Sequence, residues 1–218
     1  MMGSSSDVAS GKLKLATFHL LQNNVTLAEN ILQDIEENYT FLVSNLKFEY
    51  LNKSITLRIE NENLSTTDVV RYYVAFPVAF LLSEMYCTPR ALIPEMFRST
   101  GSYQGSLDCF HDYWQSWAEV DPRFYLHFLQ YQCYHQQNKI THKKVALSDM
   151  VLVMRHESLK YKDTAHNLLA YCLRKDRLLV QSYAVLSKSL KLKNHHNAAK
   201  WQIACLLNVA FRWFGGRH

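Results

Sequence analysis

Two Cys-His pairs are the first residues whose types and spacing could do chemistry. Cys109 lies two positions before His111, and Cys133 lies two positions before His135. A thiol and an imidazole can share a zinc ion or act as nucleophile and base. Zinc sites usually combine C-x2-4-C with H-x3-5-H spacing, and neither pair continues into such a pattern. We therefore expect no metal site, no cofactor and no enzymatic activity. One alternative stays open: an enzyme whose catalytic Cys and His are distant in the sequence and come together only in the folded chain.

Other motifs lack the residues that their chemistry requires. Residues 156–160 begin like the zinc motif H-E-x-x-H, but Lys160 replaces the second imidazole. The glycines at 101 and 105 have neither the spacing nor the lysine of a phosphate-binding loop. The five cysteines are odd in number and widely spaced, which favours reduced thiols in the cytoplasm. No apolar stretch reaches the roughly 20 residues of a membrane span, so we expect an intracellular protein without membrane association.

The charges are divided unevenly along the chain. Residues 1–109 contain 8 Lys and Arg against 12 Asp and Glu, a net −4, whereas residues 110–218 contain 16 against 7, a net +9. Dispersed cations neutralise phosphates, and aromatic faces stack on bases. The candidate phosphate contacts are Lys143, Lys144, Lys160, Lys162, Arg174, Lys175, Arg177, Lys188, Lys191 and Lys193. The candidate stacking residues among them are Tyr161, Tyr171 and Tyr183. This half therefore favours single-stranded RNA as the partner, with an acidic protein partner or an inert solvated surface as alternatives.

The elements that must position these residues are mainly helices. Apolar residues at three- and four-residue steps predict a helix over 17–43, broken near Asn23 and Asn24, and a series of later helices. The later helices are predicted over 108–120, 122–136, 147–159, 164–173, 178–192 and 198–214. Period-two alternation predicts one β-hairpin over 46–59. The residues 65–68 offer helix caps ahead of an apolar helix over 69–82, which Pro77 would kink.

The predicted fold class is mainly α, with two helical lobes and one short β-hairpin in the N-terminal lobe. Pro, Gly, Ser and Thr concentrate between Pro89 and Gly105, which indicates a boundary between lobes. We predict a flexible arm over 1–14, a first lobe over 15–100, a basic second lobe over 101–214 and a tail over 215–218.

This order of elements resembles the nucleoproteins of segmented negative-strand RNA viruses of the bunyavirus type. The match covers about residues 30–82: a helix, the hairpin from Leu46 to Ile59, and the segment T-D-V-V-R-Y-Y-V-A-F over 67–76. Those proteins are mainly helical and two-lobed. The resemblance implies a viral nucleocapsid protein of the virion that encapsidates RNA, largely independently of sequence, in a basic cleft between lobes. It also implies a homo-oligomer linked through the terminal arms.

The resemblance assigns further residues to that cleft. Lys47, Arg58 and Arg71 would face it from the first lobe, and Arg155 would join the basic clusters of the second lobe. Tyr73 is an additional stacking candidate. An ion pair with Asp68 or Glu84 is the alternative for Arg71.

A weak internal repeat in the sequence supports a second function. The pairs Ala165/Ala199, Leu169/Ile203, Ala170/Ala204 and Leu173/Leu207 recur at a spacing of 34 residues. That spacing is the period of tetratricopeptide repeats, which stack helical hairpins. The alternative to an RNA-binding nucleoprotein is therefore a helical adaptor that binds a peptide or an acidic protein partner.

Overall fold

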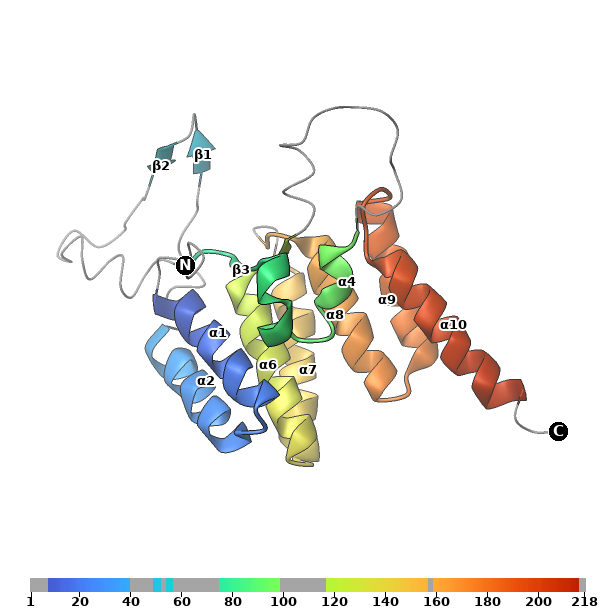
Figure 1. Cartoon of the computed structure of the whole chain (residues 1–218), viewed down its shortest axis with the longest axis horizontal. Coiled ribbons are helices and arrows are strands. Elements are labelled where there is room, and N and C mark those ends of the chain that lie inside the picture. Colours follow the sequence, from blue (N-terminus) through green and yellow to red (C-terminus); the bar gives the residue numbers. More distant parts are fainter. Residues whose placement is uncertain are drawn as a thin grey trace.

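The computed structural model describes residues 8–39, 49–51, 54–56, 75–98, 117–156 and 159–215. Within these ranges the chain is mainly helical and contains the predicted two-stranded antiparallel hairpin (Figure 1). The predicted fold class, mainly helical with one short β-hairpin, is thus confirmed. The helices follow one another as a row of antiparallel hairpins, with the hairpin α1–α2 at one end and α10 at the other.

The first two helices are α1 (Val8–Leu21) and α2 (Val25–Tyr39). The predicted break between them is confirmed, and Asn23 adopts the left-handed conformation that Asn tolerates, with φ 61°. Residues 8–14 of the predicted flexible arm are helical instead, because Ala9 and Leu13 bury their side chains in the core. The period-two pattern also holds: β1 (Glu49–Leu51) pairs antiparallel with β2 (Ser54–Thr56), and Tyr50 lies opposite Ile55.

The helix predicted over 69–82 is wrong in its described part. Residues 69–74 lie outside the described ranges, and Val78–Phe80 form strand β3, which pairs antiparallel with β4 (Ala118–Val120). Pro77 has no N–H to donate within a helix, and Val78 and Phe80 bury their side chains on one face of the strand. The helix predicted over 108–120 is also wrong at its C-terminal end, because residues 118–120 form strand β4 and pair with β3. The short helices η2 (Leu82–Cys87) and α4 (Ile93–Met96) follow β3.

Five helices make up the C-terminal part: α6 (Pro122–Gln136), α7 (Ile140–Met154), α8 (Lys162–Lys175), α9 (Leu179–Leu192) and α10 (Ala199–Gly215). Four of them match the predicted ranges closely, whereas α7 begins seven residues earlier than predicted. The tight turn at Asn138, with φ 56°, returns the chain to helix at once. A similar turn at Arg177, with φ 62°, joins α8 to α9. Each turn folds two neighbouring helices into an antiparallel hairpin.

One hydrophobic core runs through both predicted lobes. Helix α6 packs against α1, α2, α7 and α8, and α8 packs in turn against α9 and α10. The core includes Leu13 of α1, Phe80 of β3, Phe124 of α6 and Leu168 of α8. The side chains of the first helices therefore contact those of the C-terminal part directly.

A polar cluster is buried beside this core. The Glu95 carboxylate, fully buried in α4, accepts a hydrogen bond from Nδ2 of Asn167 at 2.7 Å, and Nδ2 also reaches Oδ1 of Asn197 at 3.0 Å. Asn197 in turn donates to the backbone oxygen of Ser189 at 3.0 Å. Burial raises the pKa of Glu95 to about 7, although the Asn167 hydrogen bond and the charge of Arg98 act in the opposite direction. These bonds tie α4, α8 and α9 together.

Candidate functional site

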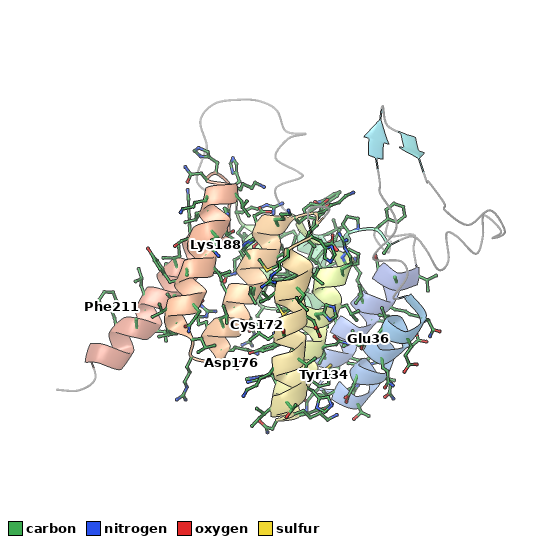
Figure 2. All side chains as sticks on the ribbon, turned by 180° about the vertical axis from the view of Figure 1, so that it is seen from behind. Glu36, Tyr134, Cys172, Asp176, Lys188 and Phe211 are labelled. Carbon is green, nitrogen blue, oxygen red and sulfur yellow. The ribbon has the colours of Figure 1, made fainter. Side chains whose placement is uncertain are left out.

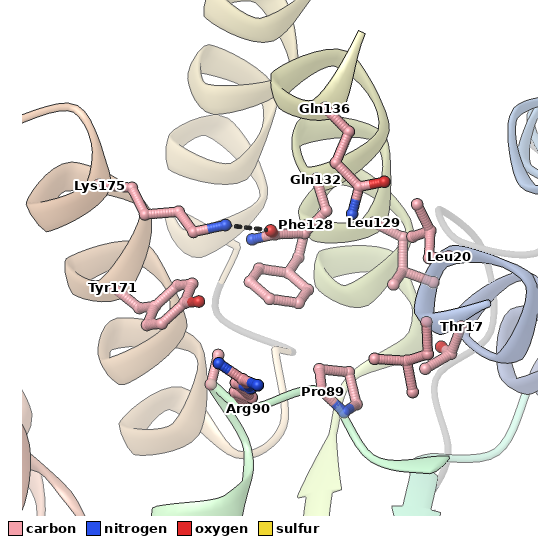
Figure 3. Close-up of a pocket in the computed structure, with 12 residues that line it drawn as sticks. Thr17, Leu20, Pro89, Arg90, Phe128, Leu129, Gln132, Gln136, Tyr171 and Lys175 are labelled. Carbon is pink, nitrogen blue, oxygen red and sulfur yellow. Dashed lines mark hydrogen bonds between the residues drawn. The ribbon is translucent and has the colours of Figure 1, made fainter. Parts of the chain in front are cut away.

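A cavity of about 170 Å³ opens where α1, α6, α8 and the segment 89–91 meet (Figure 3). Its floor is apolar and includes the buried side chains of Leu20, Phe128 and Leu129. Thr17 also lines the cavity, but its hydroxyl already bonds the Leu13 carbonyl and the Tyr125 hydroxyl, each at 2.8 Å. The floor therefore suits an apolar group.

The rim of the cavity carries positive charge around one aromatic ring. Tyr171 and Lys175 reach it from α8, and Arg90 reaches it from the segment between η2 and α4. The Lys175 ammonium lies 5.4 Å from the centre of the Tyr171 ring, and the Arg174 guanidinium lies 5.5 Å from it. Both distances allow a cation-π interaction. The rim is thus suited to an anionic group that lies next to an apolar one.

Burial affects the titration of both α8 residues. It raises the pKa of the Tyr171 hydroxyl, which the neighbouring Arg174 and Arg90 charges partly oppose. It lowers the pKa of Lys175, and Asp176 only partly compensates. The Lys175 side chain is nevertheless exposed, so its ammonium is accessible to an incoming carboxylate.

Two glutamines on α6 supply hydrogen-bonding groups on the opposite side. Gln132 and Gln136 are four residues apart and therefore lie one helical turn from each other. Oε1 of Gln132 accepts from Nζ of Lys175 at 2.9 Å, and since the ammonium can only donate, this bond sets the orientation of the amide. Nε2 of Gln132 is buried without a hydrogen-bond partner among the described residues. A ligand oxygen at this point would satisfy it.

The structure brings three of the predicted site residues together, namely Tyr171, Arg174 and Lys175. Lys143 instead forms an ion pair with Asp176 at 2.6 Å, and Lys193 lies 3.6 Å from Asp163. Lys143 and Lys193 were predicted to neutralise phosphates, but in the structure acidic side chains of the same chain already neutralise them.

The other predicted residues are distributed over several helices. Lys144 and Arg155 are exposed on and just after α7, and Arg177, Lys188 and Lys191 are exposed on or before α9. Lys160 and Lys162 are half-buried beside the start of α8, together with Tyr161. Tyr183 is half-exposed on α9. Four predicted residues lie outside the described ranges: Lys47, Arg58, Arg71 and Tyr73.

Sequence reasoning missed Arg90, Gln132 and Gln136. The two glutamines had a usable signal, because their spacing of four on a predicted helix places them on one face. No sequence pattern pointed to Arg90, because residues 90 and 175 are far apart in the chain and come to the same cavity only in the folded structure.

Two of the four cysteines that the structure describes, Cys133 and Cys172, are buried, whereas Cys87 is half-buried and Cys205 is exposed. Burial raises the pKa of the Cys133 thiol to about 12, and it raises that of Cys172 as well. Both are therefore protonated and weakly nucleophilic near neutral pH. Cys109 and His111 lie outside the described ranges. Within those ranges no three His, Cys, Asp or Glu side chains gather closely enough to hold a metal ion. No described helix combines the length and apolar character that crossing a membrane requires.

No family model, curated protein or solved structure matches the chain. The resemblance to viral nucleoproteins stays a prediction.

Proposed function

We propose that the chain is a non-enzymatic helical adaptor that binds an acidic peptide segment of another protein in the cavity between α1, α6 and α8. The observation that carries this proposal is the combination of an apolar floor with a rim formed by Arg90, Tyr171 and Lys175. The row of helical hairpins supports it, because stacked helical hairpins characteristically present extended surfaces for binding.

The cavity defines the chemistry of the segment. A dry cavity of about 150 Å³ holds a group the size of benzene, so about 170 Å³ suits one apolar side chain. Carboxylates on either side of that residue would then meet Arg90 and Lys175 through charge-assisted hydrogen bonds. A backbone carbonyl of the peptide would accept from the free Nε2 of Gln132. The expected ligand is therefore an apolar residue flanked by Asp or Glu.

Single-stranded RNA is the second candidate, favoured by the meeting of Tyr171, Arg174 and Lys175. One aromatic face with two cations can stack a base and hold its phosphate. The floor of Leu20, Phe128 and Leu129, however, is apolar, and the part of a base's polar edge that is buried against it would lose hydrogen bonds to water without replacement, which costs free energy. For this reason we favour the peptide.

A fluorescence polarisation titration distinguishes the two ligands. One probe is a fluorescein-labelled peptide with Leu between Glu residues, and the other is a labelled oligouridylate. The double variant Arg90→Glu/Lys175→Glu should bind the peptide at least about tenfold more weakly. The matched control Lys188→Glu/Lys191→Glu makes the same charge change on the exposed surface of α9 and should retain peptide affinity.

Two results would contradict the adaptor. The first is equal binding of the peptide by the wild type and the Arg90→Glu/Lys175→Glu variant. The second is stronger binding of the oligouridylate, with a log-log salt slope of about −0.7 for each neutralised phosphate, which would favour RNA. A peptide with Gly in place of Leu should bind weakly, because it leaves the cavity empty.

A further inference from the structure

We propose that copies of the chain associate end to end, the exposed apolar side of α10 in one copy covering the α1–α2 end of the next. This inference goes beyond the binding of an acidic peptide. It uses surfaces outside the cavity, so either proposal can fail without the other.

The first surface, here called the α10 face, comprises Trp201, Ala204, Leu207 and Phe211. These residues recur at steps of three and four, so they lie on one side of the helix. Trp201 is 56%, Leu207 45% and Phe211 73% exposed. The other side of α10, which includes Leu206, is buried against the array. Terminal helices of stacked arrays normally present a polar outer side, and this one presents large apolar groups.

The second surface, here called the α1–α2 face, comprises Val8, Gly11, Leu15, Phe18 and Leu27. Leu15, Phe18 and Leu27 are each 46–47% exposed. A side chain added at Gly11 would meet nothing within 4 Å in its own chain. A second helix can therefore approach α1 closely along this line.

The two ends carry opposite charge, which identifies a second copy as the occupant. Helix α2 contains four acidic residues and no Lys or Arg, but Asp34 forms an ion pair with Lys12 of α1, and Glu29 forms one with Lys139. Helices α9 and α10 contain no Asp or Glu. Lys188 and Lys191 are exposed on α9, and Lys200 is exposed on α10. On α2, Glu36 and Glu37 are exposed and accept hydrogen bonds from glutamines rather than from cations. A contact between two α10 faces would instead bring cations together.

The positions of the two faces determine the type of assembly. Figure 2 shows Glu36 of α2 and Phe211 of α10 at opposite ends of the molecule. An interface between different surfaces at opposite ends is heterologous, so it can continue from copy to copy. Each added copy leaves one α10 face and one α1–α2 face available.

Complementation between two variants tests this arrangement. Phe18→Asp places a carboxylate in the α1–α2 face, and Phe211→Asp places one in the α10 face, so each variant should lose association through that face. Both side chains are exposed, so both variants should fold. Light scattering after size exclusion should show wild-type species larger than one chain, which grow with protein concentration. Each variant alone should be monomeric. An equimolar mixture should form a one-to-one heterodimer, because each variant keeps the face that the other lacks.

Tyr86→Asp is the matched control, since Tyr86 is 93% exposed on η2 and belongs to neither face. This variant should assemble like the wild type, and circular dichroism should show unchanged helix content in all three variants. A monomeric wild type at every concentration would overturn the proposal, as would a Phe18→Asp variant that dimerises by itself. Binding of the acidic peptide should be unaffected by Phe18→Asp and Phe211→Asp.

Discussion

Helix α8 carries two polar clusters, of which one lies inside the fold and the other lines the cavity. Near its middle, Asn167 is fully buried and joins Glu95 to Asn197. Near its C-terminal end, Tyr171 and Lys175 face a cavity, and the adjacent Gln132 keeps an unused N–H donor. Each cluster keeps buried polar atoms without a hydrogen-bond partner among the described residues, Oδ1 of Asn167 and Oε2 of Glu95 in the first and Nε2 of Gln132 in the second. Only Gln132 lines the cavity, where a ligand could complete its hydrogen bonds. The place at the cavity therefore assigns binding to the second cluster, and the bonds from Asn167 to Glu95 and Asn197 assign a structural role to the first.

Replacement of Asn167 by Leu should have the largest effect. Glu95 and Asn197 would both lose a buried partner, which should lower the free energy of unfolding by about 4 kcal/mol. Urea denaturation followed by circular dichroism measures the change. The folded fraction of the variant should still bind the acidic peptide, and a loss of affinity without a loss of stability would reverse the assignment of the two clusters.

The stability of the wild type should also depend on pH through Glu95. The carboxyl keeps its proton up to about pH 7 in the folded chain, but releases it near its ordinary pKa of 4.5 when unfolded. Between these values the folded state holds more protons, so the contribution of Glu95 falls as pH rises, by about 3 kcal/mol in all. In Glu95→Gln this dependence should disappear. Unfolding curves at several pH values compare the two proteins, and parallel curves from pH 4.5 to 7 would contradict the expectation.

Tyr171→Leu should affect binding and leave stability nearly unchanged. The ring that interacts with Arg174 and Lys175 would be lost, and peptide affinity should fall about fivefold. Tyr171→Phe keeps the ring and serves as the control, so its affinity should match that of the wild type. A defect of equal size in the Phe variant would show that the hydroxyl, and not the aromatic face, contacts the ligand.

Gln132→Leu should have the smallest effect, and it should raise the stability of the fold while it lowers the affinity for the peptide. Removal of a buried N–H without a partner should raise the free energy of unfolding by up to about 1 kcal/mol. The same change should weaken peptide binding about threefold, since one hydrogen bond to the ligand is lost. Thermal unfolding and polarisation titrations measure the two quantities. A destabilised variant with unchanged affinity would place Gln132 with the architectural residues.

The sequence was sufficient for most of the helical framework. Period and turn residues located α6, α8, α9 and α10, and they also located the break at Asn23 and the hairpin at 46–59. The strands β3 and β4 were missed because each is only three residues long and each depends on its distant partner. Local patterns contain no information about such pairing.

The candidate site was only partly predictable. The cluster of basic residues near 174 indicated Arg174 and Lys175, and Tyr171 was recognised beside them. The ion pairs of Lys143 and Lys193 could not be foreseen, because their acidic partners lie 33 and 30 residues away in the chain. Net charge alone therefore overstated how many cations are available to a polyanion.

The most direct test of peptide binding in the cavity is a titration of isotope-labelled protein with the Leu-containing acidic peptide, followed by NMR of the side-chain amides. The NH2 resonances of Gln132 and Gln136 should shift progressively, while that of Asn167 should not move. Shifts confined to α9 and α10, or no shift at Gln132 in a saturated complex, would contradict binding in the cavity.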